Sequence, residues 1–357
     1  MTTARRTVVL ESDPGIYHCI SRCVRRAYLC GWDAYSGNSY EHRKEWVQKR
    51  VRELSGLFAI EVCAYAVMSN HLHLVLKCDP QSVWRWSDRE VARRWFQLFP
   101  GGRDSRGASL SADPVVVGRF LEDPDRVQCC RKRLGNLSWF MRSVNETIAR
   151  RANREDKCTG RFWEGRFKCQ RLEDDGSIVA CMAYVDLNPV RADLADCPEA
   201  SKFTSVYDRL RGRQGRHRVA ETGVWTSEGT REQRRMLKEA RRDAETDLWL
   251  CPIEHVFSRT GEPARNVDLD SYLALVDWTG RQMKLEKSGA VPHELASILE
   301  RLDLDTDNWV RGVKRYGSLY YRVAGRADRI AKAAKKAGQR WFRVMPPQIP
   351  IYRARTA

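Results

Sequence analysis

Two histidines separated by a leucine, His71-Leu72-His73, are the residues of this chain whose types and spacing could do chemistry. Side chains of a β-strand alternate between its two faces, so both imidazoles would lie on one face and Leu72 on the other. Two neutral imidazoles on one rigid strand provide half of a divalent-metal site. A polar sheet face would show the same spacing, so the metal interpretation needs further residues.

A tyrosine and an asparagine four residues apart are candidates for the rest of the site. Tyr184 and Asn188 lie in an expected helix, where residues four apart share one face. If that face meets the histidine strand, two imidazoles and a carboxamide oxygen would hold a metal ion beside a phenol hydroxyl. The metal would polarise a phosphodiester, and the tyrosine would attack it and retain the phosphate as a covalent ester. Each residue alone also suits a structural role, in helix packing or at a helix end before Pro189.

The elements expected to position these residues alternate between strands and helices. Turn signals and periodicity predict strands at 14–22, 58–68, 71–77 and 160–172, and helices at 41–56, 126–153 and 174–188. This order, β-α-β-β-α-β plus one helix, predicts an α+β fold of the ferredoxin-like arrangement, an antiparallel sheet with helices on one face. The other sheet face would be free to hold a strand of nucleic acid.

Two parts of the chain lie outside that order. Residues 79–125, which are rich in Trp and contain a Pro-Gly-Gly segment, are expected to insert a helix and a mobile loop. Residues 1–200 would form one domain, and residues 201–357 a basic, mainly helical region. Within that region the segment 212–218, Gly-Arg-Gln-Gly-Arg-His-Arg, is similar to a flexible basic linker.

The charge of the chain is strongly positive and unevenly distributed. The formal net charge is +17 over 357 residues, of which 42% are hydrophobic, as in a globular protein with more than one core. From Trp309 to Ala357 there are 13 Lys or Arg residues and a single acid, Asp328. This concentration indicates a polyanionic partner rather than a surface that is merely basic and solvated.

Cysteine spacing and hydropathy restrict the class of protein. Twelve cysteines occur without a Cys-x-x-Cys pair, which argues against a disulfide scaffold or a zinc ribbon. No stretch approaches the about 20 apolar residues of a membrane-spanning helix, and no signal peptide begins the chain. We therefore expect mostly buried free thiols, no membrane partner and a cytoplasmic, nucleoid-associated location.

Three segments together resemble a known family. They are Tyr-Ala-Val-Met-Ser-Asn-His-Leu-His-Leu-Val-Leu, Gly-Arg-Phe-Trp-Glu-Gly-Arg-Phe-Lys and Ala-Tyr-Val-Asp-Leu-Asn-Pro-Val-Arg-Ala, which begin at residues 65, 160 and 183. They look like the REP-associated tyrosine transposases, within the single-tyrosine insertion-sequence transposases of the His-hydrophobic-His (HUH) endonuclease superfamily. The insertion at 79–125 and the long region after the tyrosine helix depart from the compact members of that family.

The resemblance implies a site and a reaction. His71, His73 and Asn188 would hold a divalent metal ion, Mg²⁺ or Mn²⁺. Tyr184 would attack single-stranded, hairpin-forming DNA and form a 5′-phosphotyrosine. Residues 1–200 would then be the catalytic domain, acting in a monomer or a homodimer.

Further basic residues are expected to bind the DNA. By the same resemblance, His18 and Arg22 of the first strand would contact phosphate or support the site. Cations interleaved with aromatic rings suit single strands, and a basic helix stripe suits a phosphate backbone. The candidates are Arg161, Arg166, Lys168 and Arg171 in the strand 160–172, and Arg326, Arg329, Lys335, Lys336 and Arg340 near the C-terminus.

The sequence thus predicts a metal-dependent endonuclease and strand transferase that uses a tyrosine to cleave and rejoin single-stranded DNA. The alternative is a domesticated DNA-binding protein of the same fold that recognises hairpins without moving them. A His-metal hydrolase for small molecules would leave the basic region and the aromatic–arginine strand unexplained.

Overall fold

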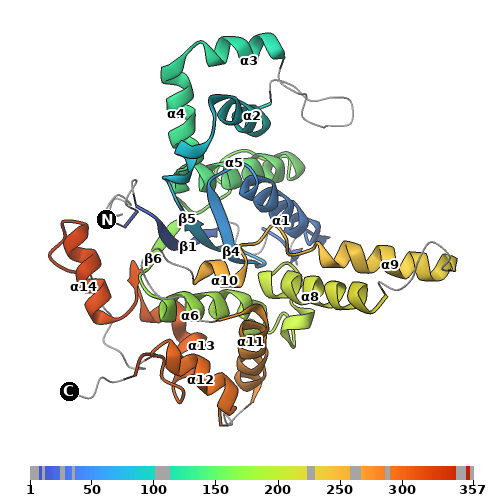
Figure 1. Ribbon diagram of the computed structural model, residues 1–357, viewed down its shortest axis with the longest axis vertical. Helices are drawn as coiled ribbons and strands as arrows, with labels where there is room; N and C mark the ends of the chain where they lie inside the picture. The colour runs from blue at the N-terminus through green and yellow to red at the C-terminus, as the bar shows by residue number, and fades with distance from the viewer. Residues whose placement is uncertain are drawn as a thin grey trace. The chain divides into compact units, whose positions relative to one another are not determined.

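The computed structural model describes residues 8–9, 13–24, 29–33, 37–100, 113–222, 230–257, 267–285, 290–342 and 351–353. The fold is α+β, with five strands in one sheet in the order β4-β5-β1-β6-β7 (Figure 1). These strands are β1 (Gly15–Arg22), β4 (Ile60–Val67), β5 (His71–Cys78), β6 (Lys168–Leu172) and β7 (Val323–Ala324), and a separate pair joins β2 (Trp32–Asp33) to β3 (Asn38–Ser39).

The chain divides into two compact units. The first comprises Met1–Glu61, Ser69–His71 and Leu76–Cys169. The second comprises Val62–Met68, Leu72–Val75 and Gln170–Ala357, so it combines the centres of β4 and β5 with the later part of the chain. The domain boundary expected at residue 200 stays a prediction.

The first elements confirm the prediction from sequence. Strands β1, β4 and β5 and helix α1 (His42–Ser55) occupy the expected segments. Helix α1 buries Val47, Val51 and Leu54 at helical spacing, and Gly56 caps its C-terminus. Both histidines of the His-Leu-His motif therefore lie on β5, directly after the Ser69-Asn70 turn.

The sheet differs from the prediction in two respects. It is not wholly antiparallel, because β7 pairs in parallel with β6 and places Val323 opposite Arg171. Its second face is not free over β4, because the consecutive residues from Cys63 to Ala66 are all 0% exposed. Neighbouring residues of a strand point to opposite faces, so both faces of β4 are covered there and cannot carry a nucleic acid strand.

The helix predicted at 126–153 is two helices, α4 (Pro124–Leu134) and α5 (Leu137–Glu155). The break lies at Gly135 and Asn136. The Asn136 side-chain oxygen accepts hydrogen bonds from the backbone N–H groups of Ser138 and Trp139, so it caps the start of α5. Periodicity alone did not reveal this cap because the apolar stripe continues across it.

The insertion at 79–125 holds more helix than predicted. It contains the short helix η2 (Ser82–Arg85), α2 (Asp88–Leu98), α3 (Pro114–Leu121) and the start of α4. Helices α2, α3 and α4 pack against one another (Figure 1). The expected Ser/Gly-rich loop falls at 101–112, outside the described residues.

The strand predicted at 160–172 is extended sheet only in its last five residues, as β6. Gly160 has a φ of 101°, a conformation that favours glycine and interrupts a regular strand. Phe162 and Phe167 are buried while Trp163 is half-buried. The two phenylalanines therefore belong to the core.

The second unit is mainly helical. It contains α6 (Asp175–Asp186), α7 (Asn188–Arg191), η3 (Pro198–Ala200), α8 (Ser205–Thr222), α9 (Arg231–Ala244), α10 (Ile253–Val256), α11 (Leu269–Lys284), α12 (His293–Arg301), α13 (Trp309–Leu319) and α14 (Ala327–Lys336). Helix α13 packs against α6, and α8 pairs with α9 (Figure 1).

The segment 212–218 is part of helix α8, so the expectation of a flexible linker is wrong. Its glycines allow α9 and the residues after it to approach closely. A Cβ atom on Gly215 would lie 2.2 Å from the backbone nitrogen of Ala244, and one on Gly212 would lie 2.1 Å from a carboxylate oxygen of Asp247. Glycine is needed here for helix contact rather than for chain flexibility.

Two expectations from composition can be compared with the structure. All twelve cysteines lie in the described residues and are free thiols, and eight of them are buried. Among the described residues, no helix is long and apolar enough to cross a membrane.

Candidate functional site

Tyr184 lies near the end of a helix that is buried on every side. Helix α6 starts with a capping box, in which the Asp174 carboxylate accepts a 2.7 Å hydrogen bond from the backbone N–H of Ser177. All residues of α6 are buried, and Tyr184 is 8% exposed. The helix stops at Asp186, earlier than predicted, because Pro189 lacks the N–H group that would continue it. Asn188 then begins the separate helix α7.

Arg191 joins Tyr184 to Asn188. Its Nη2 atom donates to the Tyr184 hydroxyl at 3.3 Å and to the Asn188 carboxamide oxygen at 2.8 Å. Its guanidinium carbon lies 4.8 Å from the centroid of the Tyr184 ring. A permanent positive charge therefore lies beside the hydroxyl of the predicted nucleophile. The sequence reasoning assigned no role to Arg191, although its spacing of seven from Tyr184 places it two helical turns further on.

Two buried donors of this cluster have no partner among the described residues. They are Nε of Arg191 and Nδ2 of Asn188. Buried polar groups are nearly always hydrogen-bonded, so donors left over in a site call for an acceptor. The oxygen atoms of a phosphate are strong hydrogen-bond acceptors of this kind.

His73 contacts the tyrosine from strand β5. The two rings meet edge to face, with centroids 5.7 Å apart and an interplanar angle of 85°. His73 is 2% exposed, so its imidazole is enclosed together with the phenol. The structure thus brings His73, Tyr184 and Asn188 into one cluster within the second unit. His71 belongs to the first unit, where its Nδ1 atom is hydrogen-bonded to the Asn70 carboxamide oxygen.

The predicted metal ligands fit a divalent cation unequally. Imidazole nitrogens are good ligands, but the Asn188 oxygen already accepts from a guanidinium. A positive charge 2.8 Å from that oxygen opposes a divalent cation at the same place. The three-ligand set therefore does not fit the bonding seen here. In the part of the chain that the structure describes, no three His, Cys, Asp or Glu side chains gather as a metal site either.

Helix α13 covers the tyrosine. Its Tyr316 ring lies 5.5 Å from the Tyr184 ring, centroid to centroid, and the Tyr316 hydroxyl donates to Gln170 at 3.2 Å. Burial raises the pKa of Tyr316 well above its usual value, which keeps the hydroxyl protonated as a donor. A Cβ atom on the next residue, Gly317, would lie 2.9 Å from the Tyr184 hydroxyl oxygen. Nothing in the local sequence indicated this long-range contact.

Both ends of α6 are hydrogen-bonded to segments much later in the chain. The Asp174 carboxylate accepts hydrogen bonds from the Tyr352 hydroxyl at 2.6 Å and from the backbone N–H of Arg326 at 2.7 Å. At the other end, the Asp186 carboxylate accepts from Tyr272 at 2.6 Å and from Ser205. Burial raises the pKa of Asp186, and these hydrogen bonds oppose that rise. Both ends of the tyrosine helix are thus fixed in place.

The other predicted residues are placed as follows. His18 is buried in β1, whereas Arg22, Arg161, Arg166, Lys168, Lys335, Lys336 and Arg340 are exposed, and Arg329 is half-buried. Two arginines are paired with carboxylates: Arg171 with Glu173 at 2.8 Å, and Arg326 with Asp303 at 2.8 Å. The ion pairs reduce the charge that these two residues can offer to DNA.

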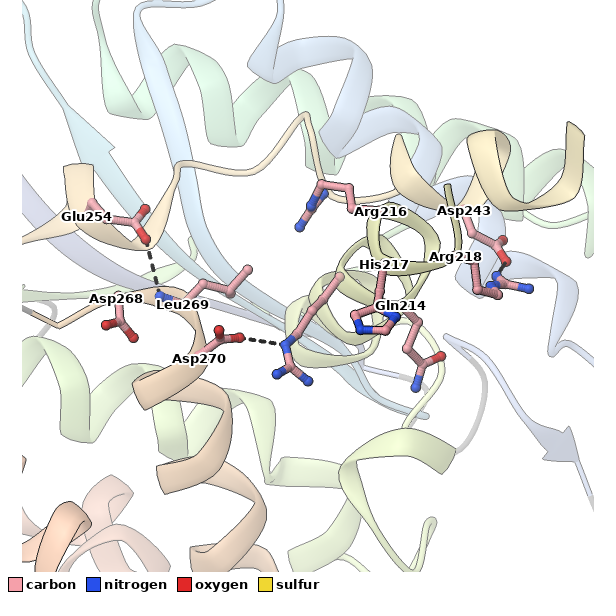
Figure 2. A pocket seen from close by; sticks show the side chains of 10 residues that line it. Gln214, Arg216, His217, Arg218, Asp243, Glu254, Asp268, Leu269 and Asp270 are labelled. Carbon is pink, nitrogen blue, oxygen red and sulfur yellow. Dashed lines mark hydrogen bonds and ion pairs between the residues drawn. The ribbon is translucent and has the colours of Figure 1, made fainter. Parts of the chain in front are cut away.

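A pocket of about 960 Å³ is lined by residues of α8, α9, α10 and α11 and holds none of the predicted site residues (Figure 2). Its basic side chains are already matched by acids. Arg213 pairs with Asp270 at 2.5 Å. Arg218 pairs with Asp243, and both are labelled in Figure 2. The lining thus carries both signs of charge, three arginines and four carboxylates.

Comparisons with family models and with curated proteins find no match. Among solved structures, the chain is similar to the structure of a REP-associated tyrosine transposase bound to a REP hairpin. The two share 11% sequence identity at a TM-score of 0.34, and the match covers 64% of this chain and 92% of that chain. At this distance the similarity assigns no residue role and no activity to the chain.

Proposed function

We propose that the chain is a DNA endonuclease and strand transferase that cleaves and rejoins single-stranded, hairpin-forming DNA through Tyr184, as in REP-associated tyrosine transposases. One observation carries the proposal. A single guanidinium nitrogen of Arg191 donates to the Tyr184 hydroxyl and to Asn188. A hydroxyl held beside a cation is suited to attack an anionic phosphodiester.

The chemistry follows from the donors around the hydroxyl. A scissile phosphate at this place would accept hydrogen bonds from Arg191 Nε and from the Asn188 amide, the two donors that lack a described partner. The Tyr184 oxygen forms a bond to phosphorus while the bond from phosphorus to the 3′-oxygen breaks. The tyrosine loses one proton and the leaving 3′-hydroxyl gains one, so the exchange is balanced. Attack by a free 3′-hydroxyl reverses it without any nucleotide cofactor.

The fold supports the same proposal. We infer a ferredoxin-like unit from β1, β4, β5 and β6, because their order in the sheet, β4-β5-β1-β6, suits a β-α-β-β-α-β chain with its first and third strands in the middle. In such a unit the third strand, here β5, carries His73 to the Tyr184 ring.

The proposal includes a requirement for Mg²⁺ or Mn²⁺. His71 and His73 would bind the metal ion, because both lie in β5 and alternation places them on one face of that strand. No step is assigned to the metal, because the Asn188 oxygen is bonded to Arg191. We expect His73→Ala and His71→Ala each to remove metal-stimulated cleavage. If chelation of all divalent metal leaves cleavage unchanged, the two histidines have another role.

A second candidate function is binding of hairpin DNA without cleavage. The burial of Tyr184 favours it, because a nucleophile that is 8% exposed and covered by Tyr316 does not reach a phosphate in this conformation. The two candidates differ in whether a covalent adduct forms.

The test is an adduct assay. A labelled hairpin with single-stranded flanks is incubated with the protein and Mg²⁺ or Mn²⁺, then separated under denaturing conditions. The endonuclease proposal predicts a protein–DNA adduct that is absent from Tyr184→Phe and present in Tyr321→Phe, a matched change at an exposed tyrosine. An adduct that persists in Tyr184→Phe would exclude this nucleophile. Tight hairpin binding without any adduct would favour the binding protein.

A further inference from the structure

Three aromatic rings and two arginines of the first unit form a cluster, termed here the indole–arginine patch. Its members are Trp95 and Phe99 at the end of α2, Arg133 on α4, and Trp139 and Arg142 on α5. The Trp95 centroid lies 4.8 Å from that of Phe99 and 6.1 Å from that of Trp139. The Arg133 guanidinium carbon lies 4.5 Å from the Trp139 centroid and 5.7 Å from the Trp95 centroid.

The patch reaches the surface and is positively charged. Phe99 is 45% exposed, and the side chain of Arg142 is 63% exposed, 5.1 Å from the Trp139 centroid. Arg142 shares its carboxylate partner, Glu146, with Arg150. Two guanidinium groups on one carboxylate leave a net positive charge at this edge of the patch.

Arg133 differs from Arg94, another arginine of the same unit that lies over an indole ring. Arg94 lies 4.1 Å from the Trp86 centroid, but it also donates to Glu90 and to two backbone carbonyls. Its donors are used within the protein. Within the described ranges, the Arg133 guanidinium lies over the two indole rings, and no hydrogen bond or ion pair joins its side chain to a carboxylate or a carbonyl. Its donors thus remain for an external acceptor.

We propose that the indole–arginine patch binds single-stranded nucleic acid, with bases stacked on the indole rings and phosphates bonded to Arg133 and Arg142. Base–aromatic stacking requires unpaired bases, because the bases of a duplex are stacked on one another. A guanidinium that lies over an indole can still donate two parallel hydrogen bonds to a phosphate. The insertion at 79–125 thereby gains a role, since it supplies Trp95 and Phe99.

The inference rests on the proposed function for the choice of DNA as ligand, but it concerns binding and not cleavage. Binding is therefore measured in Tyr184→Phe protein, where no chemistry occurs, by fluorescence anisotropy of a labelled single strand that forms no hairpin. If the unmodified protein forms no adduct in the earlier assay, the endonuclease proposal fails and this measurement is unaffected.

We expect Trp139→Ala to weaken binding of the single strand about tenfold, the effect of losing one stacked base. Trp32→Ala, at an exposed tryptophan outside the patch, should change binding less than twofold. Arg133→Gln should lower the slope of log affinity against log salt by about 0.7, one phosphate contact on a single strand. If Trp139→Ala does not fold, as judged by circular dichroism, Arg142→Ala at the exposed edge and Trp139→Phe replace it.

Three outcomes would overturn the inference. One is unchanged single-strand affinity in folded Trp139→Ala and Arg133→Gln proteins. Another is that Trp139→Ala weakens the binding of an abasic strand as much as the binding of a normal strand. An abasic strand has phosphates but no bases to stack. The third is displacement of the strand by polyglutamate at equal charge, which would indicate an acidic polypeptide as the natural partner.

Discussion

Two arginine–aromatic clusters in this molecule differ in what surrounds them. In the second unit, Arg191 of helix α7 lies against Tyr184 of the buried helix α6, and its hydrogen bonds are directed at one hydroxyl and one amide. In the first unit, Arg133 lies against two indole rings at the surface and has no described hydrogen bond through its side chain. The same pair of chemical groups therefore suits two tasks. Enclosure orients a single reacting atom, whereas exposure offers a sequence-tolerant binding face.

The sharpest way to break this comparison is to remove the charge from each cluster. Arg191→Ala should lower the rate of adduct formation by about 10²–10³-fold, comparable to losing one preorganised donor to a developing charge. Arg142→Ala in the exposed cluster should leave that rate unchanged with a short hairpin at saturating concentration. Single-turnover kinetics on denaturing gels would measure both. An equal loss of rate in the two variants would show that the clusters are not functionally distinct.

The enclosure of Tyr184 can be tested through the glycine that covers it. Gly317→Ala should destabilise the protein by about 1–3 kcal/mol, because the new Cβ would lie 2.9 Å from the Tyr184 hydroxyl oxygen in a filled space. Gly118→Ala in α3 is the matched control, since its Cβ would meet nothing within 4 Å. That change should be stabilising by about 0.5–1 kcal/mol on helix propensity alone. Urea unfolding would measure both changes, and destabilisation of similar size at both sites would contradict close packing at Gly317.

We expect the smallest effect from a change of pH, in helix α2, which carries Trp95 of the exposed cluster. A two-point hydrogen bond from Arg93 lowers the pKa of Glu90 on α2 from 4.5 to about 2, with further help from Arg94. A carboxyl with a lowered folded-state pKa stabilises the fold above pH 4.5, and this contribution disappears as the pH falls towards 2. We expect a loss of about 0.5–1 kcal/mol for such a partly exposed group. Thermal unfolding of wild type and Glu90→Gln between pH 6 and 3 should converge in acid, and parallel curves would refute the assignment.

Local patterns were sufficient to predict the first strands and helix and the helix that carries the tyrosine. Val47, Val51 and Leu54 recur at helical spacing within one helix, and the alternation around His73 lies within one strand. Such signals depend only on neighbouring residues. Tyr184 and Asn188 were also selected from their spacing, and both prove to bond to one guanidinium.

Features that depend on distant contacts were not predictable in this way. Gly215 lies in a segment whose composition is typical of a linker. In the structure, its lack of a side chain allows the backbone of Ala244 to pack closely against it. Tyr316 covers Tyr184 across more than a hundred residues of sequence, and no local signal marks such a partner. The role of Arg191 could not be predicted without the break at Leu187, because this break sets the direction of helix α7, which carries Arg191. Packing between remote segments decided the cases of Gly215 and Tyr316.

The hydrogen bond between Tyr352 and Asp174 has a consequence for the synthesis and folding of the protein. A ribosome that has finished residue 191 has already produced Tyr184 and Arg191, but the hydroxyl that completes the cap of helix α6 comes from residue 352. The same holds for Tyr316 and Gly317, which close over the tyrosine. The tyrosine helix therefore emerges from the ribosome incompletely held, and the final arrangement of the site awaits translation of residue 352.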